Sequence, residues 1–216
     1  LMNIPKDDKI RRIFVPDTEF IDMDFSQIEL KLMAHASGQN NMINAFVEGQ
    51  DLHSYTAAQI LNKPIEQIDK AGKERKVAKA INFGVIYGIG TRGLAELAGI
   101  PVRAAGKYLN VYWESYPNIK NYFDKQKTFA EENGYVKTMF GRHIPVKDRF
   151  YAAPNYIIQG TAGDIIKLSL FKTWKYAKSV GGSLRNTIHD QILFDNMDVS
   201  HAQPIKEIME DYTFSM

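Results

Sequence analysis

The sequence contains no cysteine, which excludes a disulfide framework, a thiolate metal site and a cysteine nucleophile. No apolar run approaches the ~18 residues of a membrane span, and the first residues do not resemble a secretory signal. The net charge is only +2, so a polyanionic partner must be met by a local cluster of cations. These features favour an intracellular, reducing compartment, in bacterial or host cytoplasm or in an organelle. They indicate neither a membrane contact nor an oligomer.

Several signatures of enzyme chemistry are also missing. None of the five histidines pairs with another at i, i+4 spacing, so no helical zinc site is indicated. No GxxxxGK[ST] phosphate loop is present, and Gly84, Gly88 and Gly90 do not follow a predicted strand as a dinucleotide-binding fold requires. A serine nucleophile elbow is absent as well. Zinc chemistry, these two nucleotide-binding folds and serine hydrolysis are therefore disfavoured.

Residue patterns predict strands at both ends of the chain and helices between them. Apolar residues alternate with acidic ones in 19–24, and two further strands, 184–188 and 192–195, flank a tight turn. A short hairpin is expected from 134–139 and 142–145. Helices are expected at 26–37, 41–47, 51–61, 73–87, 94–98, 102–116, 118–132 and 154–180, and from about residue 200 onward.

Two helix starts carry capping signals. Ser26 with Glu29 three residues later forms a predicted capping box, and Asp51 is the expected N-cap of its helix. Because the strands lie near the two ends, we expect the α+β class, with a sheet-based domain made of the terminal thirds and a helical insertion near 40–150. The chain starts without Met and closes inside an expected helix, which favours a fragment of a longer protein.

A first candidate site is a stripe along the 73–87 helix. Arg75, Lys79, Phe83 and Tyr87 are spaced by four, so a helix places them on one slowly drifting face that begins cationic and ends aromatic. A nucleoside triphosphate has the same polarity, because Arg and Lys suit the phosphates and an aromatic ring suits the base. The alternative is a solvated basic face that continues into an aromatic core seam, and spacing alone favours this alternative.

A second candidate site consists of two acidic residues beside predicted strands. Asp24 ends one strand and Asp190 lies in the turn between two others. Carboxylates at such positions can hold Mg²⁺ together with phosphate oxygens, although each aspartate alone is more typical of a turn or a cap. His53 follows a predicted N-cap, where it suits either a phosphate contact or an ordinary surface position.

Seven segments resemble, in order, the polymerase domain of A-family (polymerase-I-like) DNA polymerases. The first palm motif is similar to DFSQIELKLMAHAS, the fingers helix to RKVAKAINFGVIYG and the last palm motif to IHDQILFD. Between them, EGQDLH, Tyr116-Pro117, GYVKTMFGR and QGTAGDIIK also match. The resemblance covers nearly the whole chain, and it strengthens the functional interpretation of both candidate sites.

The resemblance implies an antiparallel palm sheet with helices, plus a mainly helical fingers insertion. Residues 1–39 and 151–216 would belong to the palm and 40–150 to the fingers, whereas the thumb and any exonuclease domain lie outside this chain. The implied function is template-directed addition of deoxynucleoside triphosphates to a primer 3′-hydroxyl, with primer–template DNA as partner. Two Mg²⁺ ions, or Mn²⁺ in their place, would support the phosphoryl transfer.

The resemblance also implies roles for individual residues. Asp24 and Asp190 would bridge the metals with help from the Phe25 carbonyl, and Lys79 would be the general acid for the departing pyrophosphate. Glu29 would exclude a ribose 2′-hydroxyl. The residues implied to contact the incoming nucleotide are Arg75, Lys79, Phe83, Tyr87, His53, Gln27 and Glu29. The residues implied to contact DNA are Gln159, Asn155, His189 and Arg142.

Three positions depart from the family pattern: Gln191 replaces the usual Glu, Lys31 replaces Arg, and Tyr151 replaces a basic residue. Two alternatives remain open. A single-subunit RNA polymerase shares several of these motifs, but a gate at Glu29 disfavours it. A weakened DNA-binding module is disfavoured because Asp24, Asp190 and Lys79 are all retained.

Overall fold

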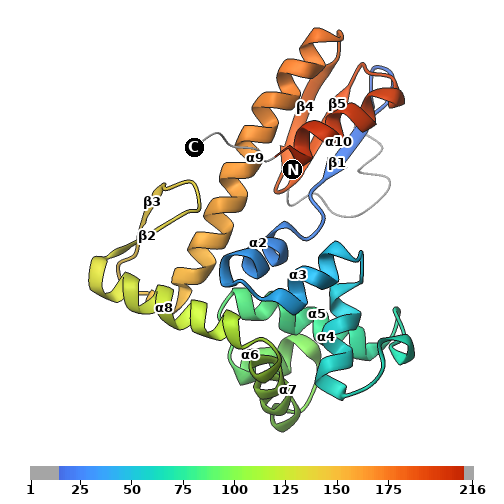
Figure 1. Cartoon of the computed structure of the whole chain (residues 1–216). Coiled ribbons are helices and arrows are strands. Elements are labelled where there is room, and N and C mark those ends of the chain that lie inside the picture. The colour runs from blue at the N-terminus through green and yellow to red at the C-terminus, as the bar shows by residue number, and fades with distance from the viewer. Residues whose placement is uncertain (1–14, 212–216) are drawn as a thin grey trace. The chain divides into compact units, whose positions relative to one another are not determined.

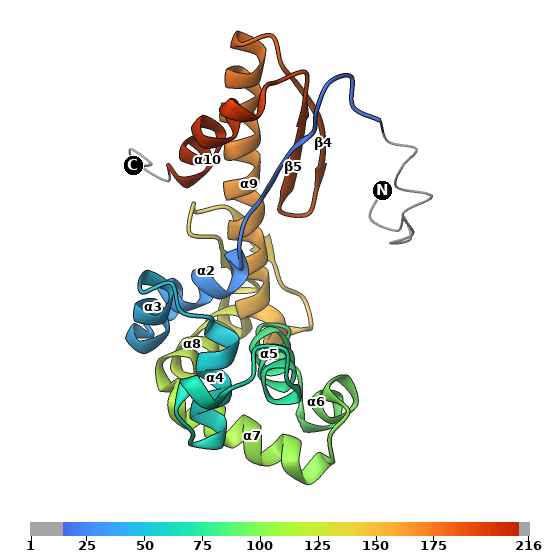
Figure 2. The same cartoon turned by 90° about the vertical axis from the view of Figure 1, so that its right-hand side faces the viewer.

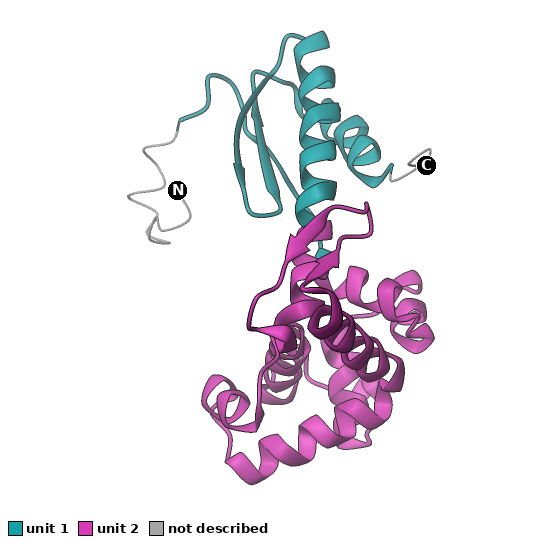
Figure 3. Ribbon diagram, turned by 90° about the vertical axis from the view of Figure 1, so that its left-hand side faces the viewer, with its two compact units in different colours: residues 1–28, 162–216 teal, residues 29–161 magenta. Residues whose placement is uncertain are grey.

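The computed structural model describes residues 15–211 (Figure 1). This part of the chain divides into two compact units, residues 15–28 with 162–211 (unit 1) and residues 29–161 (unit 2) (Figure 3). Two helices, α2 (Ile28–Ser37) and α9 (Ala153–Ser179), contribute residues to both units. The predicted palm and fingers boundaries at 39/40 and 150/151 remain a prediction.

Unit 1 is built on a three-stranded antiparallel sheet in the order β1-β5-β4. The strands are β1 (Ile21–Asp24), β4 (Ser183–Ile188) and β5 (Gln191–Asp195). Figure 2 shows them running alongside the second half of α9, with α10 (Ala202–Glu210) nearby. Gln191 at the start of β5 faces Asp24 on one side and Ile188 on the other. The end of β1 and the turn before β5 therefore meet at one end of the sheet.

Side-chain alternation explains how the central strand is buried. Ile192 and Phe194 are fully buried on β5, which places them in the core of unit 1. The pairing of β4 with β5 shifts between Leu184 and Asn186, so Arg185 is the extra residue of a β-bulge. A bulge re-aims its side chain, and Arg185 is directed toward the far end of β5, where Asp195 lies.

Unit 2 is mainly helical around one apolar core. Its complete helices are α3 (Asn40–Val47), α4 (Leu52–Leu61), α5 (Lys73–Ile86), α6 (Thr91–Ala98), α7 (Val102–Ser115) and α8 (Pro117–Asn133). A hairpin of β2 (Tyr135–Lys137) and β3 (His143–Pro145) follows α8. Short 3₁₀ turns occupy Ile65–Gln67, Phe150–Ala152 and, in unit 1, Val199–His201. The fully buried large side chains of the core include Leu30, Met33, Leu52, Ile81, Ile86, Tyr112 and Ile158.

The α+β class is confirmed, and most predicted elements agree with the structure to within a few residues. Asp51 caps α4 as predicted, because its carboxylate accepts from the Ser54 N–H at 3.0 Å. The predicted Ser26–Glu29 capping box is wrong. The chain turns between β1 and α2, Gln27 takes a left-handed φ of 54°, and the helix begins only at Ile28.

Within residues 15–211, no helix combines the length and the apolarity that a membrane crossing needs.

Candidate active site

The first site lies at the end of the unit 1 sheet where β1 finishes and β5 begins. The β4–β5 turn consists of His189, held at a φ of 55°, and Asp190. The Phe25 N–H donates to the Asp190 carbonyl at 3.2 Å and ties this turn to the end of β1. Asp24 and Asp190, far apart in sequence, are thereby brought together. A non-glycine residue with positive φ is a form of strain that is typical of functional turns.

The two carboxylates of this site repel each other. Burial raises the pKa of Asp24 above its usual value, and the charges of Asp190 and Asp22 raise it further. A hydrogen bond between the Asp24 and Asp190 side chains also favours the protonated form. A bound cation would relieve this repulsion. In the described range, no group of three or more His, Asp or Glu side chains is arranged to hold a metal. Two adjacent carboxylates are compatible with a divalent cation that completes its shell with water and phosphate oxygens.

Gln191 stands beside this pair and contacts a third acid. Its side-chain amide donates to the carboxylate of Asp22 on the neighbouring strand. A glutamate here would face Asp22 with a like charge, whereas the amide supplies a hydrogen bond. The departure from the family pattern thus leaves one negative charge fewer at this end of the sheet.

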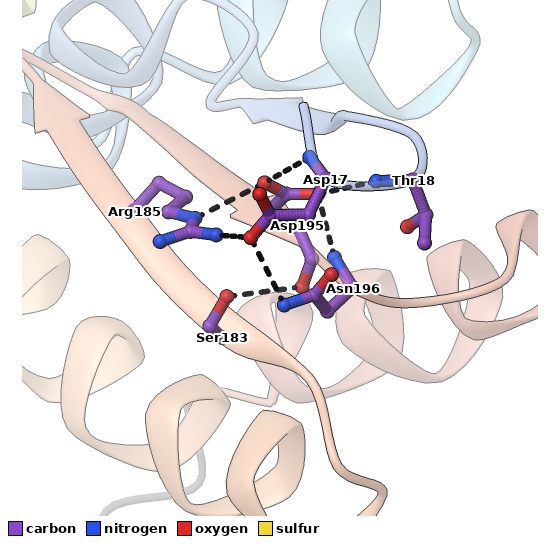
Figure 4. Close-up of polar contacts among 6 residues, drawn as sticks. All are labelled: Asp17, Thr18, Ser183, Arg185, Asp195 and Asn196. Atoms are coloured by element: carbon purple, nitrogen blue, oxygen red, sulfur yellow. Dashed lines mark hydrogen bonds and ion pairs between the residues drawn. The ribbon is translucent and has the colours of Figure 1, made fainter. Parts of the chain in front are cut away.

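At the opposite end of β5, the pKa of the Asp195 carboxylate is lowered rather than raised (Figure 4). Asp195 is almost fully buried and accepts from the N–H groups of Asp17 (3.0 Å), Thr18 (3.3 Å) and Asn196 (2.7 Å). The Arg185 Nε donates to it at 3.0 Å, and the same guanidinium pairs with Asp17. Burial opposes ionisation of Asp195, but these donors hold its pKa at about 2.

In unit 2, helix α5 presents the predicted stripe on its accessible face. Val77, Ile81 and Val85 face the core, while Lys79 is exposed. Helix α5 ends at Ile86, so Tyr87 follows it as the C-cap residue and is 51% exposed. Phe83, between Lys79 and Tyr87, is half-buried and packs against the core of unit 2, so the aromatic end of the stripe is partly in the core and partly accessible.

Arg75 is already paired. Its Nε and Nη2 donate to the two carboxylate oxygens of Asp51 at 2.6 and 2.9 Å. This bidentate bond holds the pKa of Asp51 well below its usual range and raises that of Arg75. No ion pair to Lys79 occurs among residues 15–211.

His53 is buried behind this stripe and is held by a polar network. The Asn82 amide donates to His53 Nδ1 at 3.1 Å and to Thr56 Oγ1 at 3.1 Å, and Thr56 lies 3.0 Å from the Tyr116 hydroxyl. Burial lowers the pKa of His53 to about 4, and the cations Arg75 and Lys79 lower it as well. His53 is therefore neutral near pH 7, and its proton is assigned to Nε2 because Nδ1 accepts.

Three further side chains converge in unit 2 around the Tyr87 hydroxyl. Tyr87 donates to the Glu29 carboxylate at 3.1 and 3.2 Å, and Gln159 Nε2 donates to Tyr87 at 3.1 Å. Gly88 follows with a φ of 69°, and a Cβ there would lie 3.3 Å from the Tyr151 ring. The backbone conformation favours glycine after Tyr87, and a side chain there would also press on the Tyr151 ring.

The remaining predicted DNA contacts lie on or beside α9. Asn155 is 7% exposed in the first turn, one turn before Gln159. The Arg142 Nη2 donates to the Gly160 carbonyl at 2.9 Å. A side chain at Gly160 would clash with Ile144 at 2.6 Å, so glycine lets the hairpin approach the helix. At the remaining departure from the family pattern, the Lys31 ammonium lies 6.0 Å from the centre of the Phe46 ring.

The predicted site residues fall into two groups, which are described separately. Unit 1 holds Asp24, Phe25, Gln27, His189 and Asp190, and unit 2 holds Glu29, His53, Arg75, Lys79, Phe83, Tyr87, Arg142, Asn155 and Gln159. Sequence reasoning missed the Asn82–Thr56 network and the Arg185–Asp195 pair. A polar residue within the apolar face of α5 was the available signal for Asn82.

Comparison with known proteins places the chain in a family. A model of DNA polymerase family A matches residues 1–215, and the chain belongs to that family. DNA polymerase I of Caldicellulosiruptor bescii is 39% identical over 97% of this chain and 27% of its own length. DNA polymerase I of Rhizobium leguminosarum is 37% identical over 99% of this chain and 23% of its own. The chain thus spans about a quarter of the length of these relatives.

A solved structure agrees with this assignment. The POL domain of Pol1 from M. smegmatis, in complex with DNA primer-template and dNTP, superposes with a TM-score of 0.83 at 29% identity. The match covers 97% of this chain and 40% of that one.

Proposed function

We propose that this chain carries the polymerisation chemistry of a template-directed DNA polymerase. The observation that carries the proposal is the meeting of Asp24 and Asp190 at one end of the unit 1 sheet, where the Phe25 N–H fixes the turn. The M. smegmatis relative, which holds primer-template and dNTP, supports the choice of substrates. In the reaction, the primer 3′-oxygen forms a bond to the α-phosphorus and the bond to pyrophosphate breaks.

Asp24, Asp190 and the Phe25 carbonyl would hold two divalent metal ions, which would be Mg²⁺ or, in its place, Mn²⁺. When bound, the metal supplies acidification of the 3′-hydroxyl and stabilisation of the leaving oxygen. The protein's own part at this end of the sheet is to keep the two carboxylates adjacent, where a bound cation would favour their ionised forms. Gln27 offers a further group, because its Oε1 is buried without a hydrogen-bond partner among the described residues. A donor on the incoming nucleotide would satisfy it.

The cations of unit 2 bind the triphosphate. Arg75 forks onto phosphate oxygens, neutral His53 donates from Nε2, and the Lys79 ammonium gives a proton to the departing pyrophosphate. Phe83 packs on the sugar and base, and its ring centre already lies 5.7 Å from that of His53. In this function Asn155, Gln159, His189 and Arg142 contact the primer–template.

Sugar selection falls to Glu29. The Tyr87 hydroxyl orients its carboxylate, which would occupy the space of a ribose 2′-hydroxyl. This feature favours DNA synthesis over the RNA polymerase alternative.

The test is primer extension by the intact protein with Mg²⁺, using deoxy- and ribonucleotides side by side. We expect extension with deoxynucleotides that depends on the template and on metal. Preferential use of ribonucleotides would support the RNA polymerase, and DNA binding without extension would support the binding module.

A further inference from the structure

Asp51 caps α4 and also makes a bidentate ion pair with Arg75. Its two oxygens accept from Nε and Nη2 of Arg75, so the carboxylate and guanidinium planes are locked edge to edge. The Asp51 side chain is 21% exposed and that of Arg75 is 28% exposed. Partial removal of water makes such a pair more persistent than an exposed ion pair.

The same carboxylate also fixes the start of α4. It accepts from the Ser54 N–H and the Ser54 hydroxyl, which anchors Asp51 independently of Arg75. His53 lies in the same first turn of α4, and its Nδ1 accepts from the Asn82 amide. Asp51 therefore fixes the Arg75 side chain relative to the first turn of the neighbouring helix α4.

The pair leaves most of the guanidinium available. Arginine has five N–H groups, of which Asp51 takes the one on Nε and one on Nη2. Both N–H groups of Nη1 and the second one of Nη2 remain outside the pair. Two phosphate oxygens can therefore bind the guanidinium while Asp51 stays attached.

We propose that Asp51 is a positioning residue for the triphosphate, which holds Arg75 in its binding orientation while the N–H groups outside the pair engage phosphate. This inference rests on the function proposed above. Without Asp51, the long arginine side chain must be ordered by the nucleotide itself, and this ordering weakens binding. The opposite possibility is that Asp51 competes with phosphate for Arg75, in which case its removal would strengthen binding.

Two substitutions separate positioning from capping. Asp51→Asn and Asp51→Ser keep a good N-cap acceptor for Ser54 but remove the charge and the fork. Asp198→Asn is the matched control, because Asp198 likewise caps a turn through the Ser200 N–H, at 2.9 Å. Arg75→Ala provides the second arm of a double-mutant cycle.

The measurement uses the intact protein on a primer–template whose primer ends in a dideoxynucleotide, so that dNTP binding is measured without chemistry. Single-nucleotide extension on a normal primer gives kcat and KM in parallel. We expect Asp51→Asn and Asp51→Ser to weaken dNTP binding about tenfold with kcat within about twofold, and to have no further effect when Arg75 is already alanine. Asp51→Glu should restore part of the affinity, and Asp198→Asn should leave it unchanged.

Three results would overturn the proposal. Tighter dNTP binding in Asp51→Asn would make Asp51 a competitor, and unchanged binding with a lower unfolding temperature would make it a cap only. An equal loss in the Arg75→Ala background would show that Asp51 does not act through Arg75. Failure of the wild-type protein to extend a primer is a separate outcome, which would refute the proposed function itself.

Discussion

The two ends of β5, the central strand of unit 1, lie in different electrostatic environments. At its start, Asp24 and Asp190 lie together, and burial and mutual repulsion raise the pKa of Asp24. At its other end, Asp195 is buried too, but three backbone N–H groups and Arg185 hold its pKa at about 2. The two environments are separated by the length of one five-residue strand.

The difference separates stability from function within one small sheet. A carboxylate with a full set of donors stabilises the fold and fastens Asp17 and Thr18 to the end of β5. Carboxylates left crowded together destabilise the free protein, and they persist where a ligand supplies the missing charge. Substitutions at the two ends should therefore have opposite consequences for activity and for stability.

The largest effect is expected at the crowded end. Asp24→Asn or Asp190→Asn should reduce extension by about 10²- to 10³-fold or more, because each removes a carboxylate that would hold the divalent metal. The unfolding temperature should stay unchanged or rise, since the repulsion is relieved. DNA affinity, measured by fluorescence anisotropy, should change little. Substantial Mg²⁺-dependent synthesis by either variant would remove that residue from the reaction.

The two cations of α5 should also differ in their effects. Arg75 is paired with Asp51, whereas Lys79 has no ion pair among residues 15–211. Lys79→Ala should lower kcat by about 10²- to 10⁴-fold, because it removes a general acid. Arg75→Ala should act on KM, by about tenfold or more, because it removes charge-assisted bonds to phosphate. Steady-state extension kinetics measure both. A Lys79 variant that changes only KM would not be the proton donor.

Glu29→Ala should relax sugar selection by about 10- to 100-fold, because it opens the space that the carboxylate fills. Glu29→Gln is the control, since it keeps the volume and can still accept from Tyr87. Relative kcat/KM for ribo- and deoxynucleotides measures the effect. An unchanged preference in the alanine variant would place the gate elsewhere.

Asp195→Asn should lower the unfolding temperature by several degrees at pH 7 and leave extension per folded molecule intact. A carboxyl whose pKa is lowered on folding, from 3.8 to about 2, stabilises the protein above pH 4. That contribution is lost as the pH falls from about 4 to about 2. Thermal unfolding curves of wild type and variant should therefore converge across this window, and a constant difference would refute the assignment.

Gln191→Glu should have the smallest effect. The added carboxylate faces Asp22, so the metal-free variant should unfold at a slightly lower temperature, and Mg²⁺ should reverse this. The Mg²⁺ concentration for half-maximal extension should fall about two- to fivefold, as one extra charge near the site implies. Equal Mg²⁺ curves would show that position 191 does not sense the metal. An inert wild type that Glu rescues would indicate decay of the site.

Local patterns in the sequence were sufficient for the elements but not for their register. Alternation identified β1, β4 and β5, and turn residues identified the hairpin after α8. The meeting of Asp24 with Asp190 depends on the pairing of Asp24 with Gln191, a long-range contact that no local pattern encodes. Only the resemblance to the A-family polymerases predicted that Asp24 and Asp190 lie together.

The errors and omissions have physical causes as well. The Ser26–Glu29 capping box was wrong because Ser26 and Gln27 form the turn that follows β1, and α2 begins only after them, at Ile28. The Arg185–Asp195 pair depends on a bulge in β4, and a bulge leaves no periodic signal. The Asn82 amide is satisfied by side chains from other helices, so its role becomes visible only in three dimensions.

The most direct test compares Asp190→Asn with Asp195→Asn in the intact protein, with extension rate and unfolding temperature measured on the same preparations. We expect Asp190→Asn to lose extension while keeping or gaining stability, and Asp195→Asn to lose stability while keeping extension per folded molecule. If both variants lost activity only in proportion to lost folding, the crowded end of the sheet would be structural, and the assignment of the reaction to Asp24 and Asp190 would be contradicted.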